Sequence, residues 1–101
     1  MDEFIFHIIT QSDWDEAIGQ GYYRAKSVDS EGFMHCSRTE QVEGVLERYY
    51  ANQSNLYKLT IQSNLVKAPI QYEIAPSINQ LFPHIYGNLN IDAVIEVEKI
   101  C

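Results

Sequence analysis

The sequence is poor in several residue types, and each shortage excludes a class of protein. Its only cysteines, Cys36 and Cys101, form no Cys-x-x-Cys pair, so no disulfide scaffold, zinc ribbon or redox motif is predicted. Three prolines and five glycines leave no linker or low-complexity segment. No apolar run is long enough to span a membrane, and the acidic start MDEFIF does not fit a signal peptide. We therefore expect a single domain, 1–101, in the cytoplasm with reduced thiols.

Positive charge is also scarce. Seven Lys and Arg residues face fourteen Asp and Glu residues, which gives a net charge of −7 and a pI near 4.7. The basic residues are scattered along the chain, whereas a surface that neutralises phosphates needs them clustered. We expect neither general nucleic-acid binding nor membrane binding, and the oligomeric state stays open.

Hydropathy alternation predicts five strands, at 3–9, 33–36, 56–61, 70–74 and 91–100, with a short extended segment at 81–87. Segment 3–9 is apolar on both faces, which favours a central strand. Segment 91–100 would place Ile91, Ala93, Ile95 and Val97 on one face. Pro83 disfavours a central position for 81–87, because proline cannot donate to a ladder.

Two helices are predicted. The first lies in SDWDEAIG, with Ser12 or Asp13 as its cap, and ends at Gly19 or Gly21. Its inward stripe is Trp14, Ala17 and Ile18. The second follows SRTE, a capping box with Ser37 as cap and Glu40 reaching back. Its apolar stripe is Val42, Val45, Leu46, Tyr49 and Tyr50. Residues 21–32 indicate an irregular connection, so the fold class is α+β with a mixed or antiparallel sheet of five to six strands.

All three histidines stand in short apolar runs, IFHII, GFMHCS and LFPHIYG. His7 is the only polar group on its strand face, and a buried imidazole needs a partner for at least one ring nitrogen. His35 and Ser37 share a strand face with Phe33, at the edge where a helix begins and an anion is attracted. Each histidine can instead be a hydrogen-bonded core residue. We expect the three to line one cavity.

Other candidate residues surround these motifs. His84 and Tyr86 share a parity, and together they offer an aromatic platform and a titratable donor or acceptor. Glu73 is the best-placed carboxylate for acid–base or ribose-binding work, although its alternation with Gln71 also fits a solvated face. Cys36 points to the face opposite its neighbour His35, so we interpret it as a core residue. No metal-ligand spacing is present, and no metal is predicted.

The order of these motifs resembles a bacterial family called domain of unknown function 952. FHIIT, Trp14 with Ala17, EGFMHCS, LFPHIYG and IDAV follow one another over nearly the whole chain. That family is similar in fold to the ADP-ribosyltransferases and the RNA 2′-phosphotransferases, whose bent, split β structure binds NAD in a cleft. The resemblance therefore implies an ADP-ribosylation-like bent sheet.

The resemblance also implies roles for single residues. His7 would hold a ribose of NAD, with Thr10 and Tyr23 as further binding residues, and His35 with Ser37 would lie by the nicotinamide end. Either Glu73 or His84 would fill the third motif, and Tyr86 would help to close the cleft. Two hypotheses follow: a transferase-like enzyme acting on NAD or a related nucleotide, or a non-catalytic module that binds a small anionic ligand or a protein partner. No cofactor other than NAD as a substrate is implied.

Overall fold

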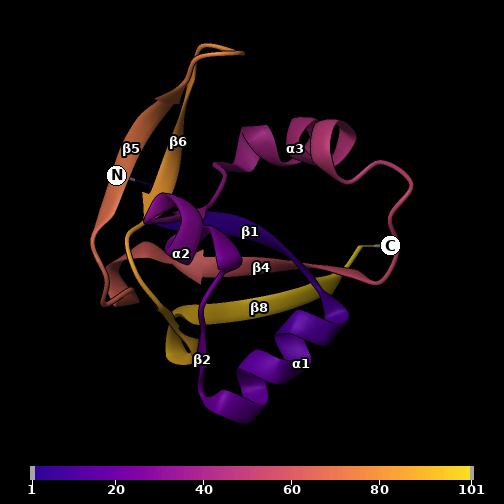
Figure 1. Ribbon diagram of the computed structural model, residues 1–101, viewed down its shortest axis with the longest axis vertical. Coiled ribbons are helices and arrows are strands. Elements are labelled where there is room, and N and C mark those ends of the chain that lie inside the picture. Colours follow the sequence, from indigo (N-terminus) through magenta and orange to yellow (C-terminus); the bar gives the residue numbers. More distant parts are fainter. Residues whose placement is uncertain (1, 101) are drawn as a thin grey trace.

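The computed structural model describes residues 2–100 and arranges them as α+β, as predicted, with antiparallel strands in three small sheets (Figure 1). The strands are β1 (Phe4–Thr10), β2 (Tyr22–Tyr23), β3 (Met34–His35), β4 (Leu56–Gln62), β5 (Ile70–Ala75), β6 (Gln80–Ile85), β7 (Leu89–Asn90) and β8 (Val94–Lys99). The helices are α1 (Gln11–Gln20), α2 (Lys26–Glu31) and α3 (Val42–Tyr49), with 3-10 turns at Thr39–Gln41, Ser63–Leu65 and Ile91–Ala93. Both predicted helices are present, and α2 is additional.

The first sheet has the order β1-β4-β8, so β4 is its middle strand and β1 is not, contrary to the prediction. β1 is nevertheless covered on both faces, since Ile5 and Ile9 on one face and Ile8 on the other are all buried. Its outer edge meets Ser37, because Phe6 and Ser37 exchange two main-chain hydrogen bonds of 2.8 and 2.7 Å. This bridge joins the first sheet to the segment that follows β3. The two three-stranded sheets are therefore connected at one point.

The second three-stranded sheet has the order β3-β6-β5, and β6 with Pro83 is its middle strand. The prediction that Pro83 would keep this segment out of a central position is wrong. The Pro83 carbonyl accepts a 3.0 Å hydrogen bond from the Cys36 N–H, just beyond the end of β3. The nitrogen that cannot donate faces that same side, where the β3 ladder has already ended. The third sheet is the short pair β2-β7.

Helix α1 begins two to three residues earlier than predicted. Its cap is Thr10, whose Oγ1 accepts a 3.2 Å hydrogen bond from the Asp13 N–H, so neither Ser12 nor Asp13 is the cap. Trp14 and Ala17 are buried as predicted, whereas Ile18 is exposed. The helix ends where Gly21 adopts a φ of 90°, a conformation that residues with a Cβ rarely take.

Residues 21–32, predicted to be irregular, contain β2 and α2. Helix α2 has only six residues and no side-chain hydrogen bond at its N-cap, Ala25. It ends at Gly32, with a φ of 95°, whose N–H donates to the carbonyls of Ser27 and Val28. A helix this short contains too few turns to give a periodic apolar pattern.

The start of α3 also differs from the prediction. Ser37 does not cap it, because the main chain of Ser37 pairs with β1. A 3-10 turn precedes the helix instead, and the Oε1 of Gln41 accepts a 2.8 Å hydrogen bond from the Arg38 N–H. Gln41 thus takes the part predicted for Glu40. None of the helix residues is fully buried, since its apolar side covers a cavity described below.

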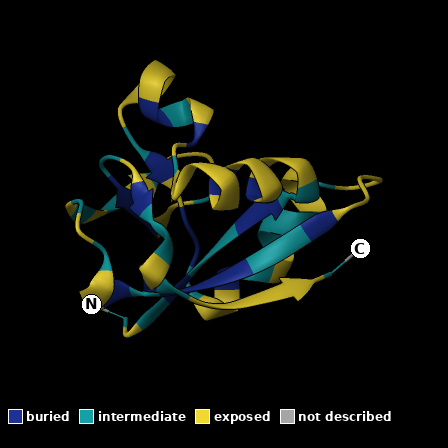
Figure 2. Cartoon of the chain, turned by 90° about the horizontal axis from the view of Figure 1, so that it is seen from below, coloured by how far each residue is buried: buried dark blue, intermediate teal, exposed yellow. Residues whose placement is uncertain are grey.

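The core lies between α1 and the inner faces of the sheets, and β8 is its exposed margin (Figure 2). The predicted strand 91–100 is a 3-10 turn followed by β8, and Ile95 and Val97 are exposed rather than on a buried face. Cys36 is buried, as predicted, and Cys101 lies outside the described residues. Within residues 2–100, no helix is long and apolar enough to cross a membrane.

Candidate functional site

The three histidines, which come from β1, β3 and β6, all line one cavity of about 690 Å³. Small-molecule sites in proteins have volumes of roughly 300–1,000 Å³, so this cavity is large enough for an organic ligand. Further lining residues come from α2 and α3, and from the end of β5, so strands of both larger sheets contribute. The aromatic, hydroxyl and charged residues of this lining are Phe33, Phe82, Tyr23, Tyr49, Tyr50, Thr10, Ser27, Ser37, Asp13, Glu31 and Lys26.

His7 has both ring nitrogens occupied. Nδ1 lies 2.6 Å from the His35 carbonyl oxygen, and a carbonyl only accepts, so Nδ1 carries the proton. Nε2 lies 3.3 Å from the Tyr23 hydroxyl and accepts from it. Burial lowers the pKa of His7 to about 4, and the His35 carbonyl opposes this shift only in part. At neutral pH, Nε2 of His7 is therefore an uncharged acceptor, which holds the hydrogen bond from Tyr23.

His35 lies at the exposed side of the cavity. Its Nε2 is 3.1 Å from Oε2 of Glu31, one helical turn earlier in sequence, and both side chains are about half exposed. Phe33 packs edge-on against the ring, with the centroids 4.9 Å apart. The shared face of Phe33 and His35, predicted from strand parity, agrees with this contact.

His84 lies directly opposite His35 in the β3–β6 register, and the two ring centroids are 5.2 Å apart. Unlike His35, it is buried. Phe33 stacks on its face with a centroid distance of 4.0 Å and an interplanar angle of 14°. Behind the ring, Oε1 of Glu73 accepts hydrogen bonds from Nδ1 of His84 at 2.7 Å and from the Tyr86 hydroxyl at 2.5 Å. The bond from Tyr86 foremost, and then that from His84, lowers the pKa of Glu73.

Six of the eight residues proposed from the sequence line the cavity, namely His7, Thr10, Tyr23, His35, Ser37 and His84. Glu73 and Tyr86 are outside the lining. Glu73 contacts it through its hydrogen bond with His84, and Tyr86 contacts it through its ring, which packs against Phe33 with the centroids 5.3 Å apart. Glu73 is thus not a carboxylate of the cavity wall, and its side chain, 39% exposed, keeps contact with solvent while it accepts two hydrogen bonds. The roles assigned to these eight residues stay predictions.

Sequence reasoning missed part of the lining. Glu31 and Lys26 belong to α2, the unpredicted helix, and the sequence indicates Asp13 only as a cap or first-turn residue of the first helix. Tyr49 and Tyr50 were assigned to the packed stripe of α3, although they line the cavity. A signal was available, because two adjacent tyrosines at a helix end exceed what a narrow apolar stripe needs.

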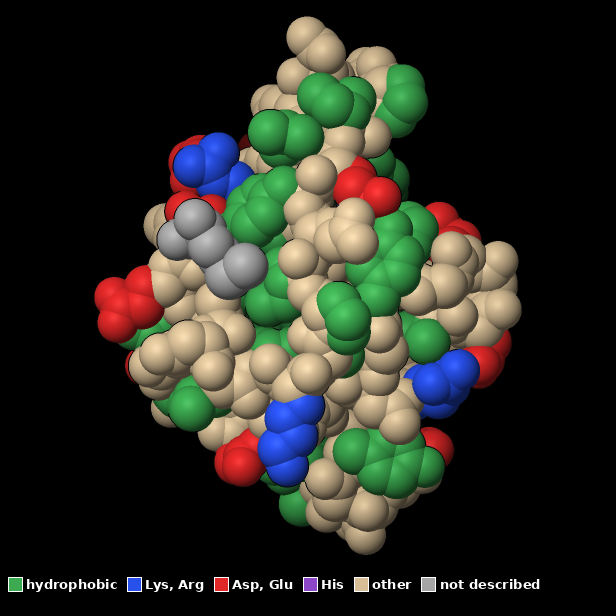
Figure 3. Space-filling model, turned by 90° about the vertical axis from the view of Figure 1, so that its left-hand side faces the viewer, with side chains coloured by type: hydrophobic (Ala, Val, Ile, Leu, Met, Phe, Trp, Pro, Cys, Tyr) green, Lys and Arg blue, Asp and Glu red, His purple; other side chains and the backbone are tan. Residues whose placement is uncertain are grey.

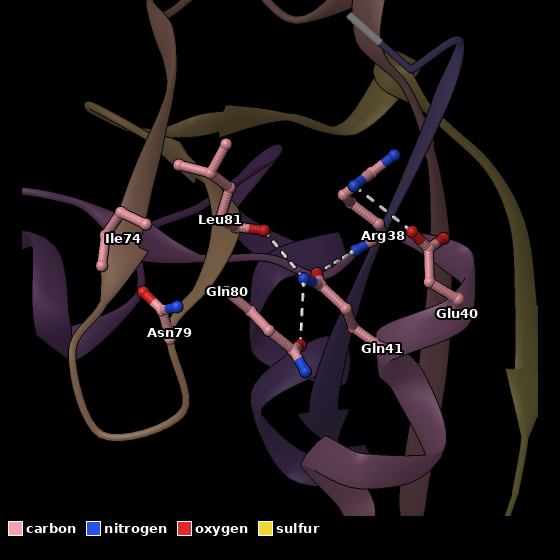
Figure 4. Close-up of a pocket in the computed structure, with 7 residues that line it drawn as sticks. All are labelled: Arg38, Glu40, Gln41, Ile74, Asn79, Gln80 and Leu81. Atoms are coloured by element: carbon pink, nitrogen blue, oxygen red, sulfur yellow. Dashed lines mark hydrogen bonds and ion pairs between the residues drawn. The ribbon is translucent and has the colours of Figure 1, made fainter.

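A second cavity, of about 460 Å³, lies where the tip of the β5–β6 hairpin meets the start of α3 (Figure 4). Several of its polar groups already have partners. The Gln41 amide nitrogen donates to the Leu81 carbonyl at 2.7 Å, and the Arg38 guanidinium pairs with Glu40 at 3.3 Å. Apolar side chains gather at the upper end of the face in Figure 3, over the β5–β6 hairpin. Ile74 and Leu81 of this hairpin are about half exposed. We therefore interpret this region as a packing contact that holds the β5–β6 hairpin against the start of α3.

Replacing Gln41 with alanine is expected to lower the free energy of unfolding by about 1–3 kcal/mol. Loss of the buried side-chain amide leaves the Leu81 carbonyl and the Arg38 N–H without their hydrogen-bond partners. Urea denaturation measures this change. Gln80→Ala is the matched control, since Gln80 is exposed and contributes one 3.4 Å contact, so a change below about 0.5 kcal/mol is expected. Equal losses in both variants would contradict the role of Gln41.

Comparison with known proteins identifies a family and similar solved structures. A family model described as "Protein of unknown function (DUF952)" matches residues 8–97. No curated protein matches the chain. The crystal structure of protein CC0527 from Caulobacter crescentus is similar, with a TM-score of 0.88 and 24% identity over 97% of this chain and 86% of that one. The solution NMR structure of the same protein has a TM-score of 0.83 and 24% identity over 98% and 85% of the two chains. These structures support the fold.

Proposed function

The chain belongs to the DUF952 family, and from the geometry of its cavity we propose that it binds NAD or a related nucleotide and supports group transfer from it. One observation carries this proposal: imidazoles from three separate strands line a single cavity, beside aromatic rings and hydroxyl groups. The resemblance of the histidine motifs to those of the ADP-ribosyltransferases supports NAD as the ligand to test first.

The wall offers a partner for each part of such a ligand. Nε2 of His7 is a neutral acceptor, which suits a ribose hydroxyl, and the Tyr23 hydroxyl beside it can exchange its bond with His7 for one with the ligand. Tyr49 and Tyr50 provide surfaces on which a base can stack. Lys26 provides a cation for a phosphate.

A non-catalytic binding module is the second candidate, and the position of Glu73 favours it. Transfer from a ribose develops positive charge at the sugar, which a carboxylate in the cavity stabilises. Glu73 is outside the lining, so the carboxylates available within it are Asp13 and Glu31. A protein with such a wall can retain a nucleotide without cleaving it.

Titration calorimetry with NAD, ADP-ribose and nicotinamide tests the binding. We expect His7→Ala to weaken affinity roughly 10- to 100-fold, because the ligand hydroxyl loses its partly buried acceptor. Tyr23→Phe is expected to weaken it by roughly 5-fold, whereas Tyr22→Phe, which alters an exposed ring outside the lining, leaves it unchanged. The absence of binding of all three compounds to the unaltered protein would overturn the proposal.

Turnover separates the two candidates. The protein is incubated with NAD, and free nicotinamide is measured by chromatography. Release of nicotinamide that depends on His35 or His84 supports the enzyme. Histidine-dependent binding with NAD intact after long incubation supports the binding module.

A further inference from the structure

His84, Glu73 and Tyr86 form a cluster that the strand register builds. Glu73 on β5 pairs with Phe82 on β6, and the alternation of β6 puts Phe82, His84 and Tyr86 on the same face. Glu73 is therefore a diagonal neighbour of His84, within reach of its ring. One oxygen, Oε1, receives both hydrogen bonds of the cluster.

These bonds fix where the proton of His84 lies. An ionised carboxylate accepts hydrogen bonds and donates none, so Nδ1 of His84 must carry the proton that it shares with Glu73. In the neutral ring, Nε2 then holds the lone pair. Tyr86 donates to the same oxygen and thereby holds the carboxylate in place.

The orientation of the ring is also fixed. Phe33 stacks on one face of the His84 imidazole, and the His35 ring lies edge-on to it. Only 11% of the His84 side chain is exposed. Nδ1 of His84 points to Glu73, which is outside the cavity lining, so the opposite edge with Nε2 is left for the cavity that His84 lines.

We propose that Glu73 and Tyr86 are positioning residues that hold His84 in the Nδ1–H tautomer, so that its Nε2 accepts a proton from the group that attacks the bound nucleotide. The chemical part rests on the function proposed above. In that step, the oxygen of an acceptor hydroxyl or of water forms a bond to the ribose C1′, and the C1′–N bond breaks. The bonding pair goes to the ring nitrogen of nicotinamide, which leaves neutral, and the hydroxyl proton moves to Nε2 of His84.

Nitrogen-15 NMR of the imidazoles in the unliganded protein tests the positioning. We expect a protonated Nδ1 and an unprotonated Nε2 for His84. Glu73→Gln is expected to keep this tautomer, because the amide oxygen still accepts from Nδ1, whereas Glu73→Ala is expected to lose it. An Nε2–H tautomer in the unaltered protein would overturn the inference. So would an unchanged tautomer in Glu73→Ala, which would leave Glu73 a merely structural residue.

Steady-state kinetics with NAD tests the chemical part. We expect Glu73→Ala and His84→Gln to lower kcat at least 10-fold, with KM for NAD within about twofold of the unaltered value, because neither change removes a ribose contact. Binding of NAD with unaltered turnover in both variants would overturn the role of His84 and leave the proposed function intact. Failure of NAD to bind at all would overturn the proposed function and the proton transfer together, whereas the tautomer measurement still decides the positioning.

Discussion

Leu59→Ala is expected to lower the free energy of unfolding by about 2–5 kcal/mol, the cost of removing a buried leucine side chain and leaving a cavity. Leu59 is fully buried in β4, the middle strand of the first sheet. It pairs with His7 on β1 and with Val97 on β8, so its side chain is packed from two strands. Urea denaturation measures the change through the midpoint, with the slope unaltered.

Leu65→Ala is the matched control, because it removes the same atoms from a side chain that is 45% exposed. We expect its effect to stay within about 0.5 kcal/mol. The substitution of Leu59 also removes the residue directly across the register from His7, so ligand affinity should fall with stability in that variant alone. A loss below about 1 kcal/mol for Leu59→Ala would contradict the assignment of Leu59 to the core.

The strands could be predicted from the sequence because alternation is a local property. β1, β4 and β5 lie within one or two residues of their expected positions. Their neighbours could not be predicted, since pairing depends on contacts between distant segments. The bridge between Phe6 and Ser37 is the example: it pairs one residue of the outer edge of β1 with a segment far along the chain, which no local pattern indicates.

The convergence of the histidines follows partly from local patterns. Parity predicted which face each ring shares with its neighbours, and the contact of Phe33 with His35 agrees with it. The pairing of His35 with His84 needed the β3–β6 register, which no local pattern specifies. The sequence supplies the three rings, and long-range pairing brings them to one cavity.

The contact between Glu73 and His84 could have been predicted if β5 and β6 had been recognised as a hairpin. Alternation alone favours the solvated interpretation of Glu73 over the functional one. A hairpin between β5 and β6 sets Glu73 opposite Phe82 and therefore diagonal to His84, and the turn residues Pro76 and Asn79 indicate such a hairpin. The sequence did not predict β2 or α2 between residues 21 and 32, because elements of two and six residues are too short to show a hydropathy period.

Lowering the pH from 6.5 to 4 is expected to reduce the free energy of unfolding by about 3 kcal/mol through His7 alone. Burial lowers the pKa of His7 from 6.5 to about 4 in the folded protein, so between these values the unfolded chain binds a proton that the folded chain does not. The contribution of neutral His7 is complete above pH 6.5, falls as the pH falls, and levels off below about 4.

His7→Gln separates this effect from the titration of carboxyl groups. Glutamine does not titrate, and its amide can still donate to the His35 carbonyl. Two carboxyl groups also titrate in this range. The pKa of Asp2 is lowered, mainly by a hydrogen bond from Tyr72, and the pKa of Glu73 is lowered, mainly by a hydrogen bond from Tyr86. Both carboxylates therefore add stability that is lost only below about pH 4.5. These losses are common to both proteins and cancel in the difference between their urea midpoints. We expect that difference to shrink steadily from pH 6.5 to 4, and a constant difference would show that His7 is not held neutral by the fold.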